Sequence, residues 1–142
     1  MMSHLLNGQH LLGGQELTSS NRIYKLCVQR DGNVVVYKHG IPIWASQTHH
    51  KGSGPYSLVM QSDNHLCLYG GNGQCIWANG THGKGRGKAF ARMQDDGNFV
   101  VYDEAERALW CTRTDGGNKP EDKYQGRGHL LSAPGMNFCF KN

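Results

Sequence analysis

Three copies of one nine-residue pattern constrain this chain more than any other feature of its sequence. The third copy runs from residue 94 to residue 102, and its alternate positions are Gln94, Asp96, Asn98, Val100 and Tyr102. A β-strand sends alternate side chains to opposite faces. The pattern therefore predicts a row of four hydrogen-bonding side chains and one aliphatic side chain on one face, with Phe99 and Val101 facing a core. We interpret residues 89–102 as one continuous strand rather than a loop.

The other two copies lie upstream at a nearly constant period. The first glutamines, at positions 29, 61 and 94, are 32 and 33 residues apart, and a tryptophan follows each copy, at positions 44, 77 and 110. The first copy consists of Gln29, Asp31, Asn33, Val35 and Tyr37, and the second of Gln61, Asp63, His65, Cys67 and Tyr69. A period in this range indicates one supersecondary unit repeated, each unable to bury its apolar face alone. Three units can close around one axis, with the tryptophans filling the centre.

The tripled pattern Gln-x-Asp-x-Asn-x-Val-x-Tyr, with its Ile-Trp-Ala tails at residues 43–45 and 76–78, resembles the monocot mannose-binding (bulb-type) lectins. Relatives in this family include fish skin-mucus lectins and some cytosolic eukaryotic proteins. The resemblance covers roughly residues 5–116. It implies an all-β fold, a β-prism of three antiparallel four-stranded sheets with pseudo-threefold symmetry. It also implies one shallow mannose pocket for each intact motif.

The domain organisation expected from this resemblance is a lectin domain at residues 1–116 and a C-terminal extension at residues 117–142. The three repeats span roughly residues 22–48, 54–80 and 87–114. In related lectins a C-terminal strand is exchanged between two protomers. We therefore expect the extension to supply such an exchanged strand, and the chain to form a homodimer or a higher oligomer.

The family roles carry over to the first and third motifs position by position. The resemblance implies that Asp31 and Asn33 hold the axial 2-hydroxyl of mannose, while Gln29 and Tyr37 reach the 3- and 4-hydroxyls and Val35 packs on the ring carbons. These residue types suit a hexose, because a carboxylate only accepts hydrogen bonds whereas amides and a phenol hydroxyl both donate and accept. In the third motif the same roles fall to Gln94, Asp96, Asn98, Val100 and Tyr102.

The second motif departs from this pattern. His65 replaces the asparagine and Cys67 replaces the valine, while Gln61, Asp63 and Tyr69 are kept. A neutral imidazole has one donor and a different reach from an amide. We expect this degenerate site to bind mannose weakly or not at all. The alternative is that a protonated His65 adapts the site to another ligand.

Composition excludes several other function classes. The net charge of +4 is modest and does not predict nucleic-acid binding. The basic segment 83–88 lacks the spacing and terminal Ser/Thr of a phosphate-binding loop, so we expect a solvated loop. No calcium-binding loop or zinc-type Cys/His spacing occurs, and no catalytic Ser/His/Asp or Cys/His arrangement belongs to the repeat. We expect no cofactor, no metal and no enzymatic activity.

The segments that bear on compartment give no sign of membrane insertion. No run approaches the roughly 20 apolar residues that a membrane span needs, and residues 1–7 do not resemble a signal peptide. We expect a cytoplasmic or unconventionally secreted protein, or one whose signal was removed.

The five cysteines cannot all pair within one chain. Cys67 and Cys75 flank a hairpin turn, where a cross-strand disulfide and free thiols are both compatible, with free thiols favoured.

The sequence therefore predicts a calcium-independent lectin that recognises α-mannosyl glycans and cross-links them multivalently. Defence against microbes is the role that the resemblance implies. The alternative is a cytosolic interaction or scaffold protein of the same fold, with protein partners.

Overall fold

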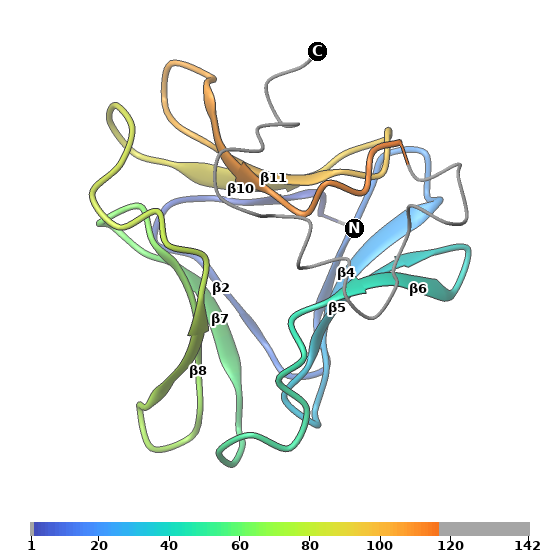
Figure 1. Cartoon of the computed structure of the whole chain (residues 1–142), viewed down its shortest axis with the longest axis vertical. Helices are drawn as coiled ribbons and strands as arrows, with labels where there is room; N and C mark the ends of the chain where they lie inside the picture. Colours follow the sequence, from blue (N-terminus) through green and yellow to red (C-terminus); the bar gives the residue numbers. More distant parts are fainter. Residues whose placement is uncertain (1, 117–142) are drawn as a thin grey trace.

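The computed structural model describes residues 2–116, which form three antiparallel sheets of four strands around a common axis (Figure 1). From the N-terminus the strands are β1 (His4–Leu5), β2 (His10–Leu12), β3 (Glu16–Thr18), β4 (Tyr24–Val28), β5 (Val34–Lys38), β6 (Ile41–Ala45), β7 (Ser57–Met60), β8 (Leu66–Tyr69), β9 (Cys75–Ala78), β10 (Phe90–Met93), β11 (Phe99–Tyr102) and β12 (Ala108–Cys111). This architecture is the predicted β-prism. Within the described range, no helix is long and apolar enough to span a membrane.

Each repeat supplies three consecutive strands to one sheet, and the N-terminal segment supplies the fourth strand to all three. The sheet orders are β3-β4-β5-β6, β2-β7-β8-β9 and β1-β10-β11-β12. The segment thus pairs in turn with the third, second and first repeats, with His4 opposite Arg92 and Glu16 opposite Cys27. All three sheets are four-stranded within residues 4–111. The exchanged C-terminal strand that we hypothesised lies outside the described residues.

The prediction that each motif is one continuous strand was wrong. β4 ends at Val28 and β5 begins at Val34, and the residues between them form a tight hairpin turn in which the Gln29 N–H donates to the Asn33 carbonyl at 2.8 Å. Gly32 has φ +94°, a left-handed conformation incompatible with an extended strand. The Asp-Gly pair inside the pattern is a hairpin signal. The Gln, Asp and Asn of each row therefore lie on a turn, and only the last two residues lie on a strand.

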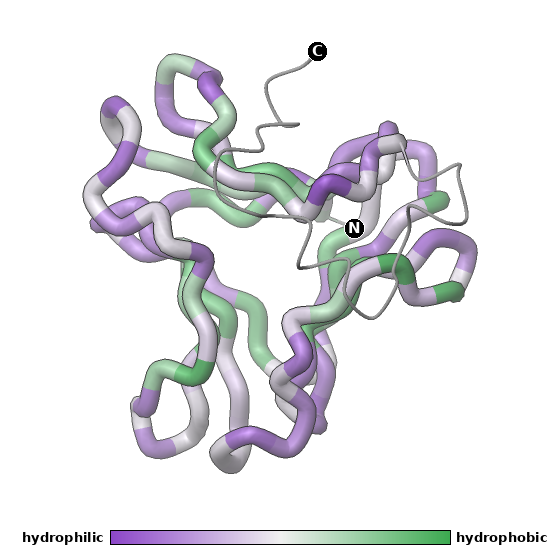
Figure 2. The backbone as a smooth tube through the Cα atoms, in the orientation of Figure 1, coloured by the Kyte–Doolittle hydropathy of each residue, from purple (hydrophilic) through white to green (hydrophobic). Residues whose placement is uncertain are grey.

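Along the strand part of each motif the predicted alternation is confirmed. Phe99 and Val101 are buried in the central core, whereas Val100 packs in a separate cluster with Tyr102 on the opposite face of the sheet. Figure 2 shows hydrophobic residues along the strands that surround the axis and hydrophilic residues at the outer turns. The row residues on the strands thus face away from the axis.

The three tryptophans meet at the centre of the prism, as the sequence predicted. The ring centroids of Trp44, Trp77 and Trp110 are 5.8 to 6.0 Å apart, with interplanar angles of 66° to 76°. Edge-to-face packing at this distance is the arrangement that aromatic quadrupoles favour. One tryptophan from each repeat therefore closes the core.

Each motif turn also packs against the strand that begins another repeat. A Cβ added to Gly32 would lie 2.7 Å from Cζ of Tyr56, and one added to Gly97 would lie 2.7 Å from Cε1 of Tyr24. These positions need glycine both for the positive φ and for the close approach of the tyrosine ring.

In the second repeat, different residues make the contact between the motif turn and the start of the next repeat. Asn64 occupies the glycine position with φ 72°, and Ala89 occupies the tyrosine position. The Asn64 side chain fills the space of the missing ring: its Oδ1 accepts from the Ala89 N–H at 2.8 Å, and its Nδ2 donates to the Lys84 and Gly87 carbonyls at 2.9 and 2.8 Å. Asparagine tolerates this backbone conformation better than other non-glycine residues.

Three cysteines of the described range are free thiols: Cys27 is half-buried, Cys67 is buried and Cys75 is exposed. The free-thiol alternative thus holds for Cys67 and Cys75 in this structure. Burial raises the pKa of the Cys67 thiol to about 11, and the neighbouring Cys75 adds to the shift. Burial and the Glu16 carboxylate raise the pKa of Cys27 to about 11.

Substituting Gly32 should cost more stability than substituting a glycine of similar φ in open space. Gly40 has φ +80° and nothing within 4 Å of its Cβ position. We expect Gly40→Ala to lower the free energy of unfolding by about 1–2 kcal/mol through backbone strain alone. Gly32→Ala should lower it by about 2–4 kcal/mol, because the methyl group must also displace the Tyr56 ring. Equal losses in urea unfolding would contradict the contact.

Alkylation should separate the thiols by exposure and pKa. At pH 8 a thiol of pKa about 11 is roughly one part in a thousand thiolate, the reactive form. Exposed Cys75 should therefore react with iodoacetamide well before Cys67, as measured by peptide mass spectrometry. Raising the pH to 10 should accelerate the modification of Cys67, and unfolding should remove the difference. Simultaneous modification of both cysteines at pH 8 in the folded chain would refute this assignment.

Candidate functional site

The first row is held together by a continuous chain of hydrogen bonds. The Tyr37 hydroxyl donates to Gln29 Oε1 at 2.7 Å, and Gln29 Nε2 donates to the two Asp31 oxygens at 3.4 and 3.5 Å. Asp31 Oδ1 also accepts from the Asn33 N–H at 2.9 Å. These contacts join the end of β5 to the β4–β5 turn, so the polar groups are fixed before any ligand arrives.

The third row repeats this network. The Tyr102 hydroxyl donates to Gln94 Oε1, Gln94 Nε2 donates to the Asp96 oxygens at 3.2 and 3.3 Å, and Asp96 Oδ1 accepts from the Asn98 N–H at 2.9 Å. Two motifs on different sheets therefore present the same polar groups in the same order.

The asparagine of each intact row has one anchored and one available end. Asn33 Oδ1 accepts from the Thr48 N–H at 3.1 Å and from Ser46 Oγ at 3.2 Å, and Asn98 Oδ1 accepts from the Arg113 N–H at 2.9 Å. Within residues 2–116, no protein acceptor is hydrogen-bonded to the Nδ2 group of either asparagine. Because the oxygen is anchored to the segment after the tryptophan, the amide nitrogen of Asn33, which is partly exposed, is left to donate to a ligand. Asn98 has the same anchored oxygen but is buried.

Sequence reasoning missed the residues that anchor these turns. Thr48 Oγ1 donates to the Gly32 carbonyl at 2.6 Å, and Thr114 Oγ1 donates to the Gly97 carbonyl at 2.5 Å. A signal for them existed: threonine stands four residues after each tryptophan, at positions 48, 81 and 114. Its regular recurrence indicated a structural role in every repeat.

All four polar residues of the first row are partly exposed, whereas in the third row the asparagine is buried and only the Gln, Asp and Tyr present surface. Val35 is 3 % exposed, and Val100 and Asn98 are each 2 % exposed. The valine positions therefore present almost no surface as the protein stands.

Burial raises the pKa of the Tyr37 hydroxyl, and the nearby Cys27 and Asp31 add to the shift. Burial likewise raises the pKa of Tyr102, against an opposing effect of Arg92, whose guanidinium lies 5.3 Å from the ring centre. Both hydroxyls therefore stay protonated, and they can donate to their glutamines at any pH below the ordinary range of tyrosine. Arg92 distinguishes the third row from the first, where Cys27 takes the equivalent position.

The second row keeps the network but changes one end of it. Gln61 Nε2 donates to Asp63 Oδ1 at 3.1 Å, and the Tyr69 hydroxyl donates to Gln61 Oε1. The His65 N–H donates to Asp63 Oδ1 at 3.0 Å, as the asparagine does in the intact rows. The imidazole, however, cannot supply the anchoring carbonyl oxygen.

Asn79 replaces that missing oxygen. Its Oδ1 accepts from the Leu66 N–H at 3.1 Å and from the Thr81 N–H at 3.2 Å. In the first repeat these two tasks are divided between Ser46 and Asn33. The exchange of both residues leaves the His65 ring without a structural task in the turn.

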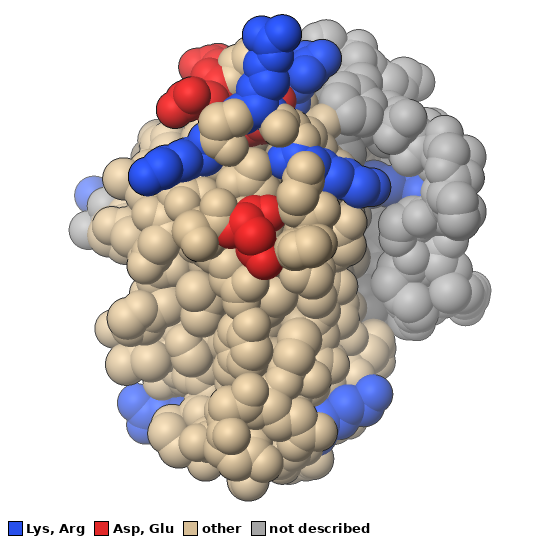
Figure 3. Space-filling model, turned by 90° about the vertical axis from the view of Figure 1, so that its left-hand side faces the viewer, with Lys and Arg blue, Asp and Glu red and all other residues tan. Residues whose placement is uncertain are grey.

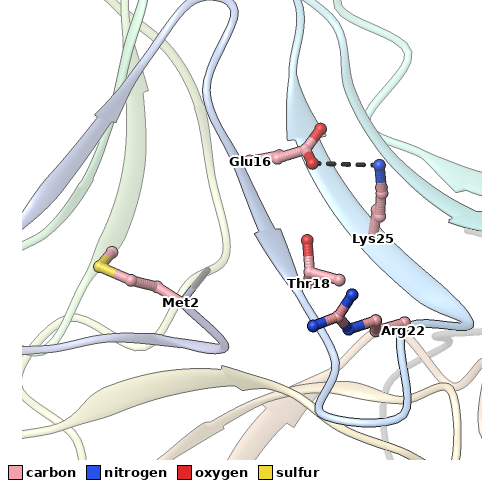
Figure 4. Close-up of a pocket in the computed structure, with 5 residues that line it drawn as sticks. All are labelled: Met2, Glu16, Thr18, Arg22 and Lys25. Atoms are coloured by element: carbon pink, nitrogen blue, oxygen red, sulfur yellow. Dashed lines mark ion pairs between the residues drawn. The ribbon is translucent and has the colours of Figure 1, made fainter.

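The pocket drawn in Figure 4 lies away from the rows. It is an open hollow of about 410 Å³ beside β3 and β4, lined by Met2, Glu16, Thr18, Arg22 and Lys25. Its main polar contact is an ion pair at 3.2 Å between the exposed side chains of Glu16 and Lys25. Such a pair contributes little energy in water. No row residue lines this hollow, and we do not assign it a function.

Comparison with known proteins relates the chain to lectins. No family model matches the chain. It is 44 % identical over 70 residues to curculin-2 of Molineria latifolia, across 49 % of this chain and 42 % of that protein. It is 39 % identical over 72 residues to the B-type lectin plumieribetin of Scorpaena plumieri, across 51 % of this chain and 61 % of that protein. The chain thus spans about half the length of the curated relatives that it matches.

Solved structures match over a greater length. A monomeric monocot mannose-binding lectin of Gastrodia elata is 32 % identical, over 80 % of this chain and 98 % of that one, with a TM-score of 0.73. The mannose-specific agglutinin of snowdrop (Galanthus nivalis), solved with methyl α-D-mannoside, is 31 % identical over 75 % and 94 %, with a TM-score of 0.67. These lectins are binding proteins, in agreement with the expectation that the chain is not an enzyme. The fold, the repeated motif and this similarity along nearly the whole length of the lectin structures show that the chain belongs to the monocot mannose-binding, or bulb-type, lectins.

Proposed function

We propose that the chain is a calcium-independent lectin that binds α-mannosyl glycans at its first and third rows. The observation that carries this proposal is that two rows on separate sheets combine the Gln–Asp–Tyr hydrogen-bond network with an asparagine whose oxygen is anchored to the segment after the tryptophan. The second row has the network but lacks the asparagine. The mannoside complex of the snowdrop agglutinin supports the choice of ligand. Calcium independence belongs to the proposal because the polar groups of each row can meet sugar hydroxyls directly, without a bridging cation.

The chemistry of the rows suits the axial 2-hydroxyl of mannose. The Asp31 carboxylate accepts a hydrogen bond from that hydroxyl, and the available Asn33 Nδ2 donates one to it. A bond to the charged carboxylate is stronger than one between neutral groups. Glucose places its 2-hydroxyl equatorially, so one of the two partners is left unpaired, at a cost of about 1–3 kcal/mol. Gln29 and Tyr37 then bind the 3- and 4-hydroxyls.

Multivalency compensates for weak individual sites. A shallow, hydrated pocket of this kind binds a monosaccharide with a dissociation constant of about 1 mM. The first and third rows lie on different sheets around the axis, so one chain presents two sites in different directions (Figure 1). Simultaneous binding to branched glycans raises avidity without new contacts. Association into a dimer or a higher oligomer increases the number of sites and cross-links the glycans.

The second row does not take part in mannose binding in this proposal. His65 removes the amide that donates to the 2-hydroxyl, and Cys67 removes the valine. The three remaining polar residues hold each other as in the intact rows, but they lack the partner that selects the axial hydroxyl.

Calorimetric titration with methyl α-mannoside in EDTA tests the proposal. The unmodified chain should bind about two sugars, Asp31→Ala and Asp96→Ala should each bind about one, and the double variant should bind none. Asp63→Ala is the matched control in the second repeat and should still bind about two. Absence of binding by the unmodified chain at several millimolar sugar would show that the rows are structural, and the proposal would fail.

A further inference from the structure

The second row is the part of the molecule that the proposed function leaves unused, and it carries two imidazoles. The ring centroids of His65 and His82 are 5.7 Å apart, with an interplanar angle of 56°. His82 Nε2 lies 3.6 Å from Asp63 Oδ2, and the side chain of His82 is 71 % exposed. The two rings therefore stand side by side at the carboxylate, open to solvent.

This arrangement is specific to the second repeat. The position of His65 is an asparagine in the other two rows, where its oxygen is tied to the following segment. The substitution of Asn79 for Ser46 takes over that tie. His65 is thereby free to turn its ring toward His82. The second repeat thus differs from the first at two linked positions, His65 and Asn79. It lacks the asparagine proposed to bind mannose and has a histidine pair there instead.

A basic segment is fastened to the same turn. The Gly83 N–H donates to the Asp63 carbonyl at 2.7 Å, and Asn64 Nδ2 binds the carbonyls at both ends of segment 84–87. Lys84, Arg86 and Lys88 are exposed. Figure 3 shows Lys and Arg side chains gathered at one end of this face of the molecule, with acidic side chains beside them. Asn64, which replaces the glycine of the other rows, thus fastens the backbone of this basic segment to the turn that carries His65.

We propose that the second row is a distinct site for an acidic saccharide, a hexose that carries a sulfate or carboxylate group, and that it binds this ligand better in mildly acidic solution. The retained Gln61, Asp63 and Tyr69 bind hydroxyl groups, as in the intact rows. The imidazoles and Lys84 bind the anionic group. This inference goes beyond mannose binding, and it rests on the proposed function in one respect, the binding of sugar hydroxyls by row residues.

The direction of the pH dependence follows from the charges at the site. At neutral pH the Asp63 carboxylate repels an anion, and Lys84 is the cation nearest in the chain. Imidazole is the side chain type whose charge changes between about pH 5 and 8, so a pair of imidazoles is the part of the site that responds to mild acid. Burial opposes the charged form of Asp63, but hydrogen bonds from Gln61 and the His65 N–H, with the two imidazoles, lower its pKa, so it stays ionised. Burial raises the pKa of Cys67 and of Tyr69, so both stay neutral in acid.

Asp103 and Glu104 pack against the basic segment: Asp103 Oδ2 accepts from the Arg86 N–H at 2.9 Å, and the Glu104 N–H donates to the Arg86 carbonyl at 2.9 Å. These carboxylates offset part of the charge of the basic segment, so the change on acidification comes from the histidine pair.

The experiment uses the Asp31→Ala/Asp96→Ala chain, in which the mannose-type rows are disabled. The probes are mannose 6-sulfate, methyl glucuronide and methyl α-mannoside, titrated calorimetrically at pH 5.5 and 7.5. We expect one site for an anionic probe, with affinity at least about tenfold higher at pH 5.5, the effect of charge-assisted hydrogen bonds. Binding should weaken as salt is added. Preference for the sulfate or for the carboxylate identifies which acidic sugar the site takes.

Variants separate the histidine pair from general surface charge. His82→Asn in the same background should reduce the affinity at pH 5.5 to nearly that at pH 7.5, and the exposed position makes misfolding improbable. His65→Asn/Asn79→Ser, which restores the residues of the first repeat, should do the same. His49→Asn, at the position equivalent to His82 in the first repeat, should have no effect.

Two results would overturn the inference: affinity independent of pH, or affinity unchanged by His82→Asn while Lys84→Ala/Arg86→Ala abolishes binding. The second would assign binding to the basic segment and not to the row. Since the background lacks both mannose-type carboxylates, failure of mannose binding in the unmodified chain leaves this result unaffected.

Discussion

The mutual contact of Trp44, Trp77 and Trp110 on the axis is the interaction on which the rest of the structure depends. Each ring packs on the other two, so a single repeat cannot form the contact and the three must fold together. The contact also positions the sites. Each tryptophan is followed four residues later by a threonine, and Thr48 and Thr114 anchor the motif turns of the first and third repeats. Packing at the centre is thereby transmitted to the polar rows on the outer faces.

The second repeat shows how one unit of a symmetric fold can change without disturbing the others. Two contacts have been rebuilt by exchanging both partners: a glycine and a tyrosine became Asn64 and Ala89, and an asparagine and a serine became His65 and Asn79. In the first exchange Asn64 bonds to the Ala89 N–H. In the second, Asn79 accepts the two backbone hydrogen bonds that Ser46 and Asn33 accept in the first repeat. Because the structural task is met by the partner, the residue at the row is free to take a different chemical role.

Features that depend on the repeat and on the alternation of residues along a strand could be predicted from the sequence. The period near 33 residues predicted three equivalent sheets, and the alternation around Val100 predicted which strand residues face the core. The turn in each motif was missed, because polar residues at every second position suit a strand as well as an Asx turn. The sequence also could not predict that β1, β2 and β3 each join a different sheet. Strand pairs far apart in the sequence, such as His4 and Arg92, leave no local pattern. The hydrogen bond from the Thr48 N–H that orients the Asn33 side chain could be found only in the three-dimensional structure.

In the proposed function the first and third rows bind mannose and the second row does not. A two-dimensional ¹H–¹⁵N NMR titration with methyl α-mannoside tests it directly, since it observes each row separately in one sample. The side-chain amides of Asn33 and Asn98 and their backbone neighbours should shift together at millimolar sugar, while the amides of His65 and Asn64 stay in place. Equal shifts in all three rows, or shifts confined to residues outside them, would contradict the account.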